Sequence, residues 1–505
     1  MSDSPQETEV DWFIFVAGSL LLVAVIIPIV FAPDASRELI ANVFTFLTTE
    51  MGIVYIIAAT LIFVFLLVVA VSGWGRIRLG DQPPQYSSAS WIAMLFSCGI
   101  GASLIYWGAA EWVFYYLDPP FGIEAKSDEA VLWAMSYGMF HWGPVGWALY
   151  CLPAIALACS YHIKKIPSLR LSDACEPVLG SYTHRIPGRI IDLLFIIGLL
   201  GTAATGLGLG TSVVASAATR MTGLEDGFEM QAIIIVIVTI TIAYSVYRGM
   251  DDGIRVLSNI NMSLALILVT FVLLVGPTRF ILEMAIVSIG HITSNFVRMM
   301  TWADPLERSS FVESWTVFYW AWWLALGPFV GMFVCKISHG RSIREVIFGM
   351  LGWGSLGCWL FFIVFGNHAF FLEQQGILPI VQEASEVSPS AAIASIIAIL
   401  PFGTFWLFYL AVIGIIFTAT TYDSASYTLA AGASRYLGEH DHPARWHRVF
   451  WAAALGILPA CLLYLGGIRV LQTASVVASL PLLLVYLMLA VSIVRTLSSA
   501  VATKD

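Results

Sequence analysis

The chain has 505 residues, of which 59% are hydrophobic and 11% are charged, and its mean hydropathy is +0.85. Because soluble domains carry roughly 25% charged residues, this composition excludes a soluble protein and predicts an all-α polytopic membrane protein. The net charge of −9 comes without a basic patch, which argues against nucleic-acid partners.

Apolar runs follow one another along the whole chain. Roughly 20 apolar residues span a bilayer, and about twelve such runs are present. Residues 280–300, between the seventh and eighth runs, are expected to form an amphipathic surface helix. No polar stretch could bury a core of its own, so we expect residues 1–505 to form a single membrane domain. The expected spans are residues 11–32, 51–73, 88–117, 132–160, 189–219, 231–248, 256–277, 311–336, 343–371, 401–431, 447–466 and 470–495.

The distribution of Lys and Arg predicts the orientation, since cytoplasmic loops hold the excess of both. With the N-terminus inside, most basic residues fall in the cytoplasm, and the acidic loops at residues 118–129 and 225–229 fall outside. We therefore expect both termini to be cytoplasmic, with short tails at residues 1–10 and 496–505. The acidic N-terminal tail lacks the basic segment of a signal peptide, so the first span is expected to be retained.

Two runs contain glycines that would loosen a helix. In the third run, residues 97–103 read Ser-Cys-Gly-Ile-Gly-Ala-Ser, and we expect a break that lines a cavity. The fifth run carries Gly201, Gly206, Gly208 and Gly210, for which unwound backbone and close packing through small residues both stay open.

Glu111, also in the third run, is a functional candidate because a carboxylate inside a membrane is costly. Its place toward the outer end of the run would also allow it to be solvated.

Aromatic residues gather in the fourth and eighth runs. Trp142, Trp147 and Tyr150 lie within an arc of roughly 140° on a helical wheel. In the eighth run, Trp322 and Trp323 lie near the middle, which argues against the tryptophan belts found at span ends. Aromatic faces attract cations that cannot donate hydrogen bonds, such as quaternary ammonium groups. We therefore expect two aromatic walls that form a box.

The tenth run contains a cluster of hydroxyl side chains around Asp423. Hydroxyl oxygens could bind a small cation such as sodium, and an intramembrane carboxylate is a functional candidate. The alternative is that the hydroxyls bond back to the preceding helical turn. The cluster comprises Thr418, Thr420, Thr421, Ser424 and Ser426.

Enzyme motifs are missing from the sequence. It contains no HExxH, GxSxG, Walker A or paired-cysteine pattern. This argues against an enzyme and against a bound metal other than sodium.

The eighth run and the loop that follows it carry three specific motifs. Trp315-Thr-Val-Phe-Tyr-Trp-Ala-Trp-Trp323, Gly327-Pro-Phe-Val-Gly-Met-Phe333 and Ser338-His-Gly-Arg-Ser-Ile-Arg344 resemble the signature of the betaine/choline/carnitine transporter (BCCT) family. The resemblance covers essentially the whole chain, including residues 91–101 and 140–144.

The resemblance implies a particular fold and assembly. Twelve transmembrane helices are implied, with residues 88–277 and 311–495 forming inverted repeats of the LeuT type and residues 11–73 forming two peripheral helices. It also implies a homotrimer in which the helix at 280–300 takes part, in the bacterial inner membrane.

The resemblance further implies a substrate site in the aromatic box. Cation carriers of the family have an acid where this chain has Ser103, so a zwitterion is favoured, such as glycine betaine, carnitine or dimethylsulfoniopropionate. Betaine members add a tryptophan where this chain has Leu326, and Phe114 resembles an aromatic patch of carnitine members. The implied substrate residues are Trp142, Trp147, Tyr150, Trp322, Trp323, Phe114, Trp320, Leu326 and Ser103.

Sodium coupling is implied in the same way. Sodium-independent exchangers of the family carry an arginine and a methionine where this chain has Asn261 and Val330, which favours symport. A sodium-independent carnitine or betaine exchanger and choline uptake remain alternatives, as does a transporter-like receptor, which would need a signalling domain. The implied sodium-binding residues are Ser97, Ile100, Phe417, Thr420 and Thr421.

Overall fold

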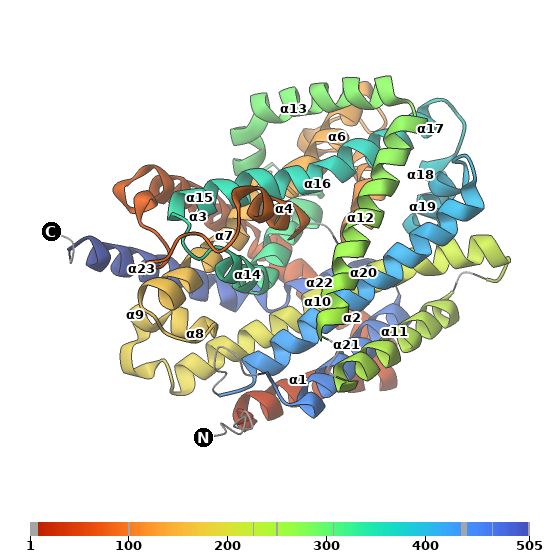
Figure 1. Cartoon of the computed structure of the whole chain (residues 1–505). Coiled ribbons are helices and arrows are strands. Elements are labelled where there is room, and N and C mark those ends of the chain that lie inside the picture. Colours follow the sequence, from red (N-terminus) through yellow and green to blue (C-terminus); the bar gives the residue numbers. More distant parts are fainter. Residues whose placement is uncertain are drawn as a thin grey trace.

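The computed structural model describes residues 9–98, 101–225, 227–248, 251–306, 308–435, 442–466 and 468–502. In these residues the chain is almost entirely helical and contains no strand, only two isolated bridges, Val10 with Ser434 and Arg78 with Ser342. Figure 1 shows long helices packed into one body. The all-α class predicted from composition is confirmed.

Among the described residues up to Thr301 there are thirteen α-helices (Figure 1). They are α1 (Trp12–Phe31), α2 (Pro33–Thr45), α3 (Gly52–Val71), α4 (Ser88–Cys98), α5 (Ala102–Leu117), α6 (Asp128–His141), α7 (Pro144–Ala158), α8 (Leu171–Ala174), α9 (Glu176–Leu179), α10 (Ile186–Thr222), α11 (Phe228–Arg248), α12 (Asp251–Val275) and α13 (Thr278–Thr301).

The described residues after Thr301 contain ten more (Figure 1). They are α14 (Phe318–Ile337), α15 (Ile343–Gly349), α16 (Ser355–Phe361), α17 (Asn367–Gln374), α18 (Ile380–Glu386), α19 (Pro389–Ala398), α20 (Gly403–Gly432), α21 (Arg445–Leu465), α22 (Ile468–Val476) and α23 (Ser479–Ala502). Single π-helical turns join several of them, including Val312–Val317 before α14 and Met350–Gly354 between α15 and α16.

Most expected spans coincide with these helices. Among the described residues, 10 helices are long and apolar enough to cross a membrane, or 11 if the bent pair α4 and α5 counts as one span. The sixth and seventh expected runs coincide with α11 and α12, but only the shorter stretches Phe228–Tyr244 and Ile260–Val275 are apolar within the described residues. The total of twelve therefore stays a prediction.

The third expected span is interrupted where its glycines predicted a break. The axes of α4 and α5 differ by 56°. Residues 99–100, between these two helices, lie outside the described residues.

The fifth expected span is not interrupted. Helix α10 runs unbroken from Ile186 to Thr222, so the hypothesis of unwound backbone there is wrong. Gly201 serves close packing, because a Cβ there would lie 1.9 Å from the carbonyl oxygen of Ala474 in α22. Thr205 also donates a hydrogen bond of 2.5 Å to the carbonyl of Leu471. Small residues here let two helix backbones approach, as membrane bundles commonly require.

Helix α13 matches the expected surface helix at 280–300. It packs against α6 and α17, and Figure 1 shows it along the edge of the molecule. One stripe containing Ile281, Ala285 and Ile292 is buried, while Ile286 and Val297 on its other faces are exposed. By length and composition α13 also qualifies as a span, so its place at the membrane surface stays a prediction.

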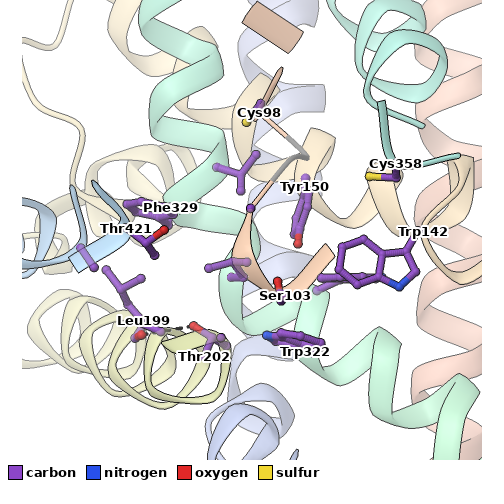
Figure 2. Close-up of a pocket in the computed structure, with 18 of the residues that line it drawn as sticks. Cys98, Ser103, Trp142, Tyr150, Leu199, Thr202, Trp322, Phe329, Cys358 and Thr421 are labelled. Carbon is purple, nitrogen blue, oxygen red and sulfur yellow. Dashed lines mark hydrogen bonds between the residues drawn. The ribbon is translucent and has the colours of Figure 1, made fainter. Parts of the chain in front are cut away.

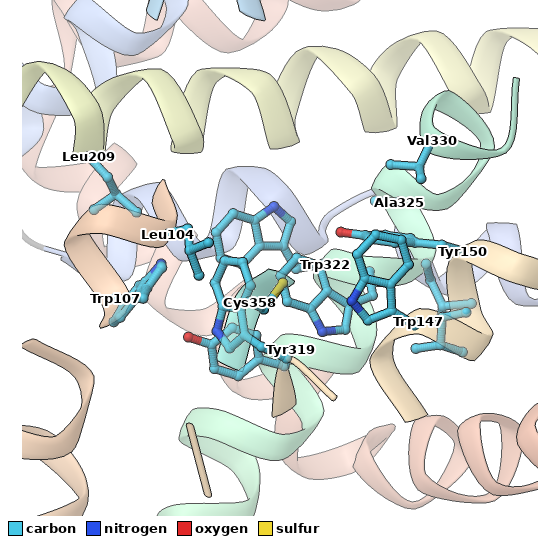
Figure 3. Close-up of a cluster of buried hydrophobic side chains, with 14 of the residues drawn as sticks. Leu104, Trp107, Trp147, Tyr150, Leu209, Tyr319, Trp322, Ala325, Val330 and Cys358 are labelled. Carbon is cyan, nitrogen blue, oxygen red and sulfur yellow. The ribbon is translucent and has the colours of Figure 1, made fainter. Parts of the chain in front are cut away.

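Two helix pairs form the centre of the molecule: α7 packs along α14, and α10 packs along α20. Glycine makes the first contact close, because a Cβ at Gly331 of α14 would lie 2.9 Å from the backbone nitrogen of Ala154 in α7. Figure 3 shows the buried cluster beside this contact, with Tyr319 and Trp322 between Trp107 and Trp147. The tryptophan-rich segments predicted from sequence thus lie side by side.

The packing of α10 gives a first prediction. Gly201→Ala is expected to lower the apparent melting temperature of the purified protein by about 5 °C or more, because the added methyl group meets the α22 backbone. Gly206→Ala on the same helix is the matched control, since no heavy atom lies within 4 Å of a Cβ there. Equal melting temperatures for the two variants, measured by thermal unfolding in detergent, would contradict this account.

Candidate substrate site

The aromatic residues of α7 and α14 surround a cavity of about 180 Å³ in the middle of the bundle. Helices α5, α10 and α20 complete its walls through Ser103, Thr202 and Thr421. Figure 2 shows Trp142 and Trp322 on one side of this cavity and Phe329 and Thr421 on the other, with Ser103 between them. Within the described part of the chain, none of the lining residues is Asp, Glu, Lys or Arg.

The rings beside the cavity meet one another at steep angles. The centroids of Trp142 and Trp323 are 4.7 Å apart with an interplanar angle of 77°, and Tyr150 lies 5.4 Å from Trp323 at 73°. Trp322 and Trp323 stack with their centroids 5.0 Å apart. Trp147 completes the group with its edge against Tyr150, at 5.5 Å. The π faces therefore point in several directions around one space, which suits a compact cation.

A break between α6 and α7 holds this arrangement. Helix α6 ends at His141 and α7 begins at Pro144, so the carbonyl of His141 is free to accept a hydrogen bond from Nε1 of Trp323 at 2.9 Å. Gly146 leaves room for that indole, because a Cβ there would lie 2.8 Å from the same nitrogen.

Glycine also seats Trp147. A Cβ at Gly354 would come within 2.5 Å of the Trp147 ring. The ring therefore packs directly on the backbone of the π-helical turn between α15 and α16.

The predicted substrate residues divide into two groups. Seven of them line the cavity: Trp142, Trp147, Tyr150, Trp322, Trp323, Leu326 and Ser103. Two lie elsewhere. Phe114 packs on Trp107 and Trp315, and Trp320 is fully buried against Phe140 and His141.

A second and larger cavity, of about 1620 Å³, adjoins the first. The two share Cys98, Phe329, Val330 and Thr421. Charged residues line other parts of the larger cavity, including Arg170 and Lys336. The shared residues place the aromatic box at the inner end of a wide, partly charged vestibule.

Four of the five predicted sodium-binding residues line the second cavity: Ser97, Phe417, Thr420 and Thr421. The fifth, Ile100, lies outside the described residues. The third and tenth spans thus meet at the boundary between the two cavities, through Cys98 and Thr421. A sodium site there stays a prediction.

The hydroxyl cluster of α20 is partly used within its own helix. Thr418 donates to the carbonyl of Gly414 at 2.7 Å, Thr420 to that of Ile416 at 2.9 Å, and Ser426 to that of Asp423 at 2.9 Å. For these hydroxyls the alternative of bonding back to the helix is the one observed. Hydroxyl oxygens remain for a hard cation at Thr421 and Ser97, which line the larger cavity.

Asp423 has a partner of the opposite charge. Its carboxylate lies 3.4 Å from a guanidinium nitrogen of Arg448, whose side chain is only 3% exposed. Removing either member would take away a close opposite charge from a buried group, which is destabilising. Asp423 is therefore part of an ion pair between α20 and α21, which accounts for its presence without a bound sodium ion.

Glu111 is not solvated, so the alternative that its position in the span left open is wrong. Its side chain is 0% exposed, and it accepts hydrogen bonds from Tyr115, from Tyr319 at 2.5 Å and from Nε1 of Trp142 at 3.2 Å. Sequence reasoning missed the roles of Tyr115 and His141 in this network. The one available signal was the spacing of Glu111 and Tyr115, which are one helical turn apart.

Cavity residues outside the two aromatic runs were also missed. Cys358 and Thr202 line the cavity. They belong to helices distant in sequence, and no local pattern singles them out.

The chain is similar over nearly its whole length to known transporters. The family described as BCCT, betaine/carnitine/choline family transporter, matches residues 13–502. The carnitine transporter of Acinetobacter baumannii is 32% identical over 488 residues, which cover 96% of this chain and 89% of that one. The glycine betaine transporter OpuD of Bacillus subtilis is 33% identical over 483 residues, 93% of this chain and 91% of that one.

Two further proteins are similar. The uncharacterized transporter YeaV of Escherichia coli is 35% identical over 419 residues, 83% of this chain and 87% of that one. A Na⁺-coupled sialic acid symporter, solved in a substrate-bound outward-open state, has a TM-score of 0.40 and 13% identity, covering 87% of this chain and 84% of that one. From the match over residues 13–502 and the identities above 30%, the chain belongs to the betaine/carnitine/choline (BCCT) family and is a multi-pass membrane transporter, not an enzyme.

Proposed function

We propose that this transporter imports a zwitterionic quaternary ammonium or sulfonium compound, such as glycine betaine, carnitine or dimethylsulfoniopropionate, by sodium symport and alternating access. The observation that carries the proposal is the cavity in which the rings of Trp142, Trp323 and Tyr150 face one another beside unpaired polar groups. Moving a quaternary ammonium group out of water is costly, and each ring returns at most about 2 kcal/mol, so several rings are needed.

The polar groups of the cavity favour a ligand that carries its own negative charge. Nε1 of Trp322 is buried and has no hydrogen-bond partner among the described residues. A buried indole N–H without an acceptor is unfavourable, and a ligand carboxylate would satisfy it. Ser103 lies beside Trp322 in Figure 2 and offers a second donor. With no charged side chain on the described walls, a zwitterion brings both charges and leaves the cavity neutral.

Sodium would bind next to the substrate. Thr421 lines both cavities, and Ser97 lines the larger one close to the bend between α4 and α5. Hydroxyl and carbonyl oxygens are the ligands that a hard cation prefers. Sodium held there would favour the substrate-binding form of the broken helix, which is how coupling would arise.

We further propose the assembly that accompanies this function. Residues 88–277 and 311–495 would form the two inverted repeats, after the peripheral helices at 11–73. Apolar residues exposed on α13, such as Ile286 and Val297, suit packing in a homotrimer or against lipid. Both termini would be cytoplasmic, in the bacterial inner membrane, because Lys and Arg gather on that side.

Uptake into proteoliposomes tests the proposal. Labelled glycine betaine, carnitine, choline and dimethylsulfoniopropionate are offered with and without an inward sodium gradient, and accumulation of a zwitterion only with the gradient is expected. Uptake that does not depend on the sodium gradient but requires substrate inside the proteoliposomes would identify an exchanger instead. Accumulation of choline alone would replace the zwitterion with a net cation.

The aromatic box gives a second prediction. Trp323→Leu is expected to raise the KM for the zwitterion at least about 30-fold, because roughly 2 kcal/mol of cation–π interaction is lost. Trp353→Leu is the control, since Trp353 is 41% exposed and does not line the cavity. Unchanged uptake kinetics in Trp323→Leu proteoliposomes would remove the box from the substrate site.

The sodium site gives a third prediction. Thr421→Ala is expected to raise the sodium concentration for half-maximal uptake about tenfold, the loss of roughly 1.4 kcal/mol from one oxygen ligand. Thr418→Ala is the matched control on the same helix, because its hydroxyl bonds to Gly414 and lines neither cavity. The same sodium dependence in both variants and in the parent protein would place the ion elsewhere.

A further inference from the structure

Glu111 occupies an unusual position behind the aromatic box. It lies on α5, is 0% exposed and does not line the cavity, yet it contacts a residue that does. Nε1 of Trp142 donates a hydrogen bond of 3.2 Å to one of its carboxylate oxygens. The box therefore has an acidic group one layer behind its wall, even though Ser103 replaces the acid that cation carriers of the family place in the wall itself.

The surrounding hydrogen bonds suit an ionised Glu111. An indole nitrogen can only donate, so Trp142 requires Glu111 to accept, and Tyr319 donates to the same oxygen at 2.5 Å. Tyr115 donates to the other oxygen. Three donors directed at two oxygens match the acceptor capacity of a carboxylate.

The series of hydrogen bonds continues beyond Tyr115 and is consistent with an ionised Glu111. Nδ1 of His141 lies 2.9 Å from the Tyr115 hydroxyl, and its Nε2 lies 3.1 Å from the hydroxyl of Thr316. A neutral His141 that carries its proton on Nδ1 donates to Tyr115 and accepts from Thr316. Every polar side-chain atom in this series of hydrogen bonds is then paired, and the series supplies no positive charge to Glu111.

No Lys or Arg within the described residues forms an ion pair with Glu111, and its nearest basic group is His141, 3.9 Å away. A buried carboxylate without a cation is unfavourable even when it is hydrogen-bonded. A positive group bound on the cavity side of Trp142 would be attracted by this charge. The hydrogen bond to the carboxylate also enriches the indole in electron density, which strengthens its attraction for a cation.

We propose that Glu111 is a positioning residue that acts through Trp142 and makes the box select a positively charged head group over a neutral group of the same shape. The inference rests on the proposed function, because it concerns how the same cavity recognises its substrate. In this account the selectivity for charge comes from Glu111, which lies outside the cavity wall, while the aromatic rings supply shape and contact area.

Two ligands that have the same shape but differ in charge test the proposed role of Glu111. Glycine betaine and 3,3-dimethylbutyrate differ only in a quaternary nitrogen or carbon at the head group. Dissociation constants are measured on the purified full-length protein by tryptophan fluorescence. We expect Glu111→Gln, which keeps the shape of the side chain and removes its charge, to reduce the preference for glycine betaine about tenfold, mainly by weakening its binding.

Two further variants keep the test decisive. Glu111→Asp keeps the charge, so the preference is expected to stay within about twofold of the parent protein even where both ligands bind more weakly. Thr316→Val is the matched control, because it removes the hydrogen bond between Thr316 and His141 and leaves those of Glu111 in place. If Glu111→Gln does not fold, a preference lost in Glu111→Asp would still overturn the inference.

The outcomes separate this inference from the proposed function. Equal weakening of both ligands by Glu111→Gln would show a structural role only, and an unchanged preference would show that the carboxylate does not act on the box. A parent protein without preference for the charged ligand would contradict the proposed function itself. If the parent protein binds only choline, the pair choline and 3,3-dimethylbutanol carries the same comparison and the same criteria.

Discussion

Polar groups inside a membrane protein must find their partners within the protein, because hydrocarbon offers none. Most of the polar groups near the centre of this chain meet that requirement. Trp323 donates to the free carbonyl of His141, Asp423 pairs with Arg448, and the hydroxyls of Thr418 and Thr420 bond back to α20. Several buried polar atoms of the described residues nevertheless have no partner. Nε1 of Trp322 is one of them, and it belongs to a residue that lines the aromatic cavity.

The same requirement explains why the two helix breaks matter. Between α6 and α7 the freed carbonyl is taken by Trp323, so that break builds the wall of the box. Between α4 and α5 the chain bends by 56° beside Ser97, where the two cavities meet. One break thus shapes the binding surface, and the other lies beside the hydroxyl groups proposed for an ion. Substrate and ion would bind within one region, which is what coupled transport needs.

Much of this arrangement follows from local sequence. The apolar runs predicted the spans, the glycines of residues 97–103 predicted the break, and Trp142, Trp147 and Trp323 predicted the box. The glycines of the fifth run show where such reasoning ends. The fifth run is rich in glycine like the interrupted third run, but its helix is continuous. The backbone of Ala474 lies against Gly201, so this glycine is part of a helix–helix contact. Trp320 shows the same limit, because it lies in the same aromatic segment as Trp322 yet packs on Phe140.

The sequence by itself determined that this is a membrane transporter of one family with aromatic residues suited to a quaternary head group, because apolar length, glycine placement and ring content are local properties. Only the tertiary structure decided what surrounds each polar group. Asp423 and Glu111 are both carboxylates inside spans, and nothing local separates them. Asp423 meets Arg448 from α21, whereas Glu111 meets Tyr319 and Trp142 and no cation. The electrostatics of a buried charge depends on neighbours from other helices, and their identity is fixed only when the helices pack.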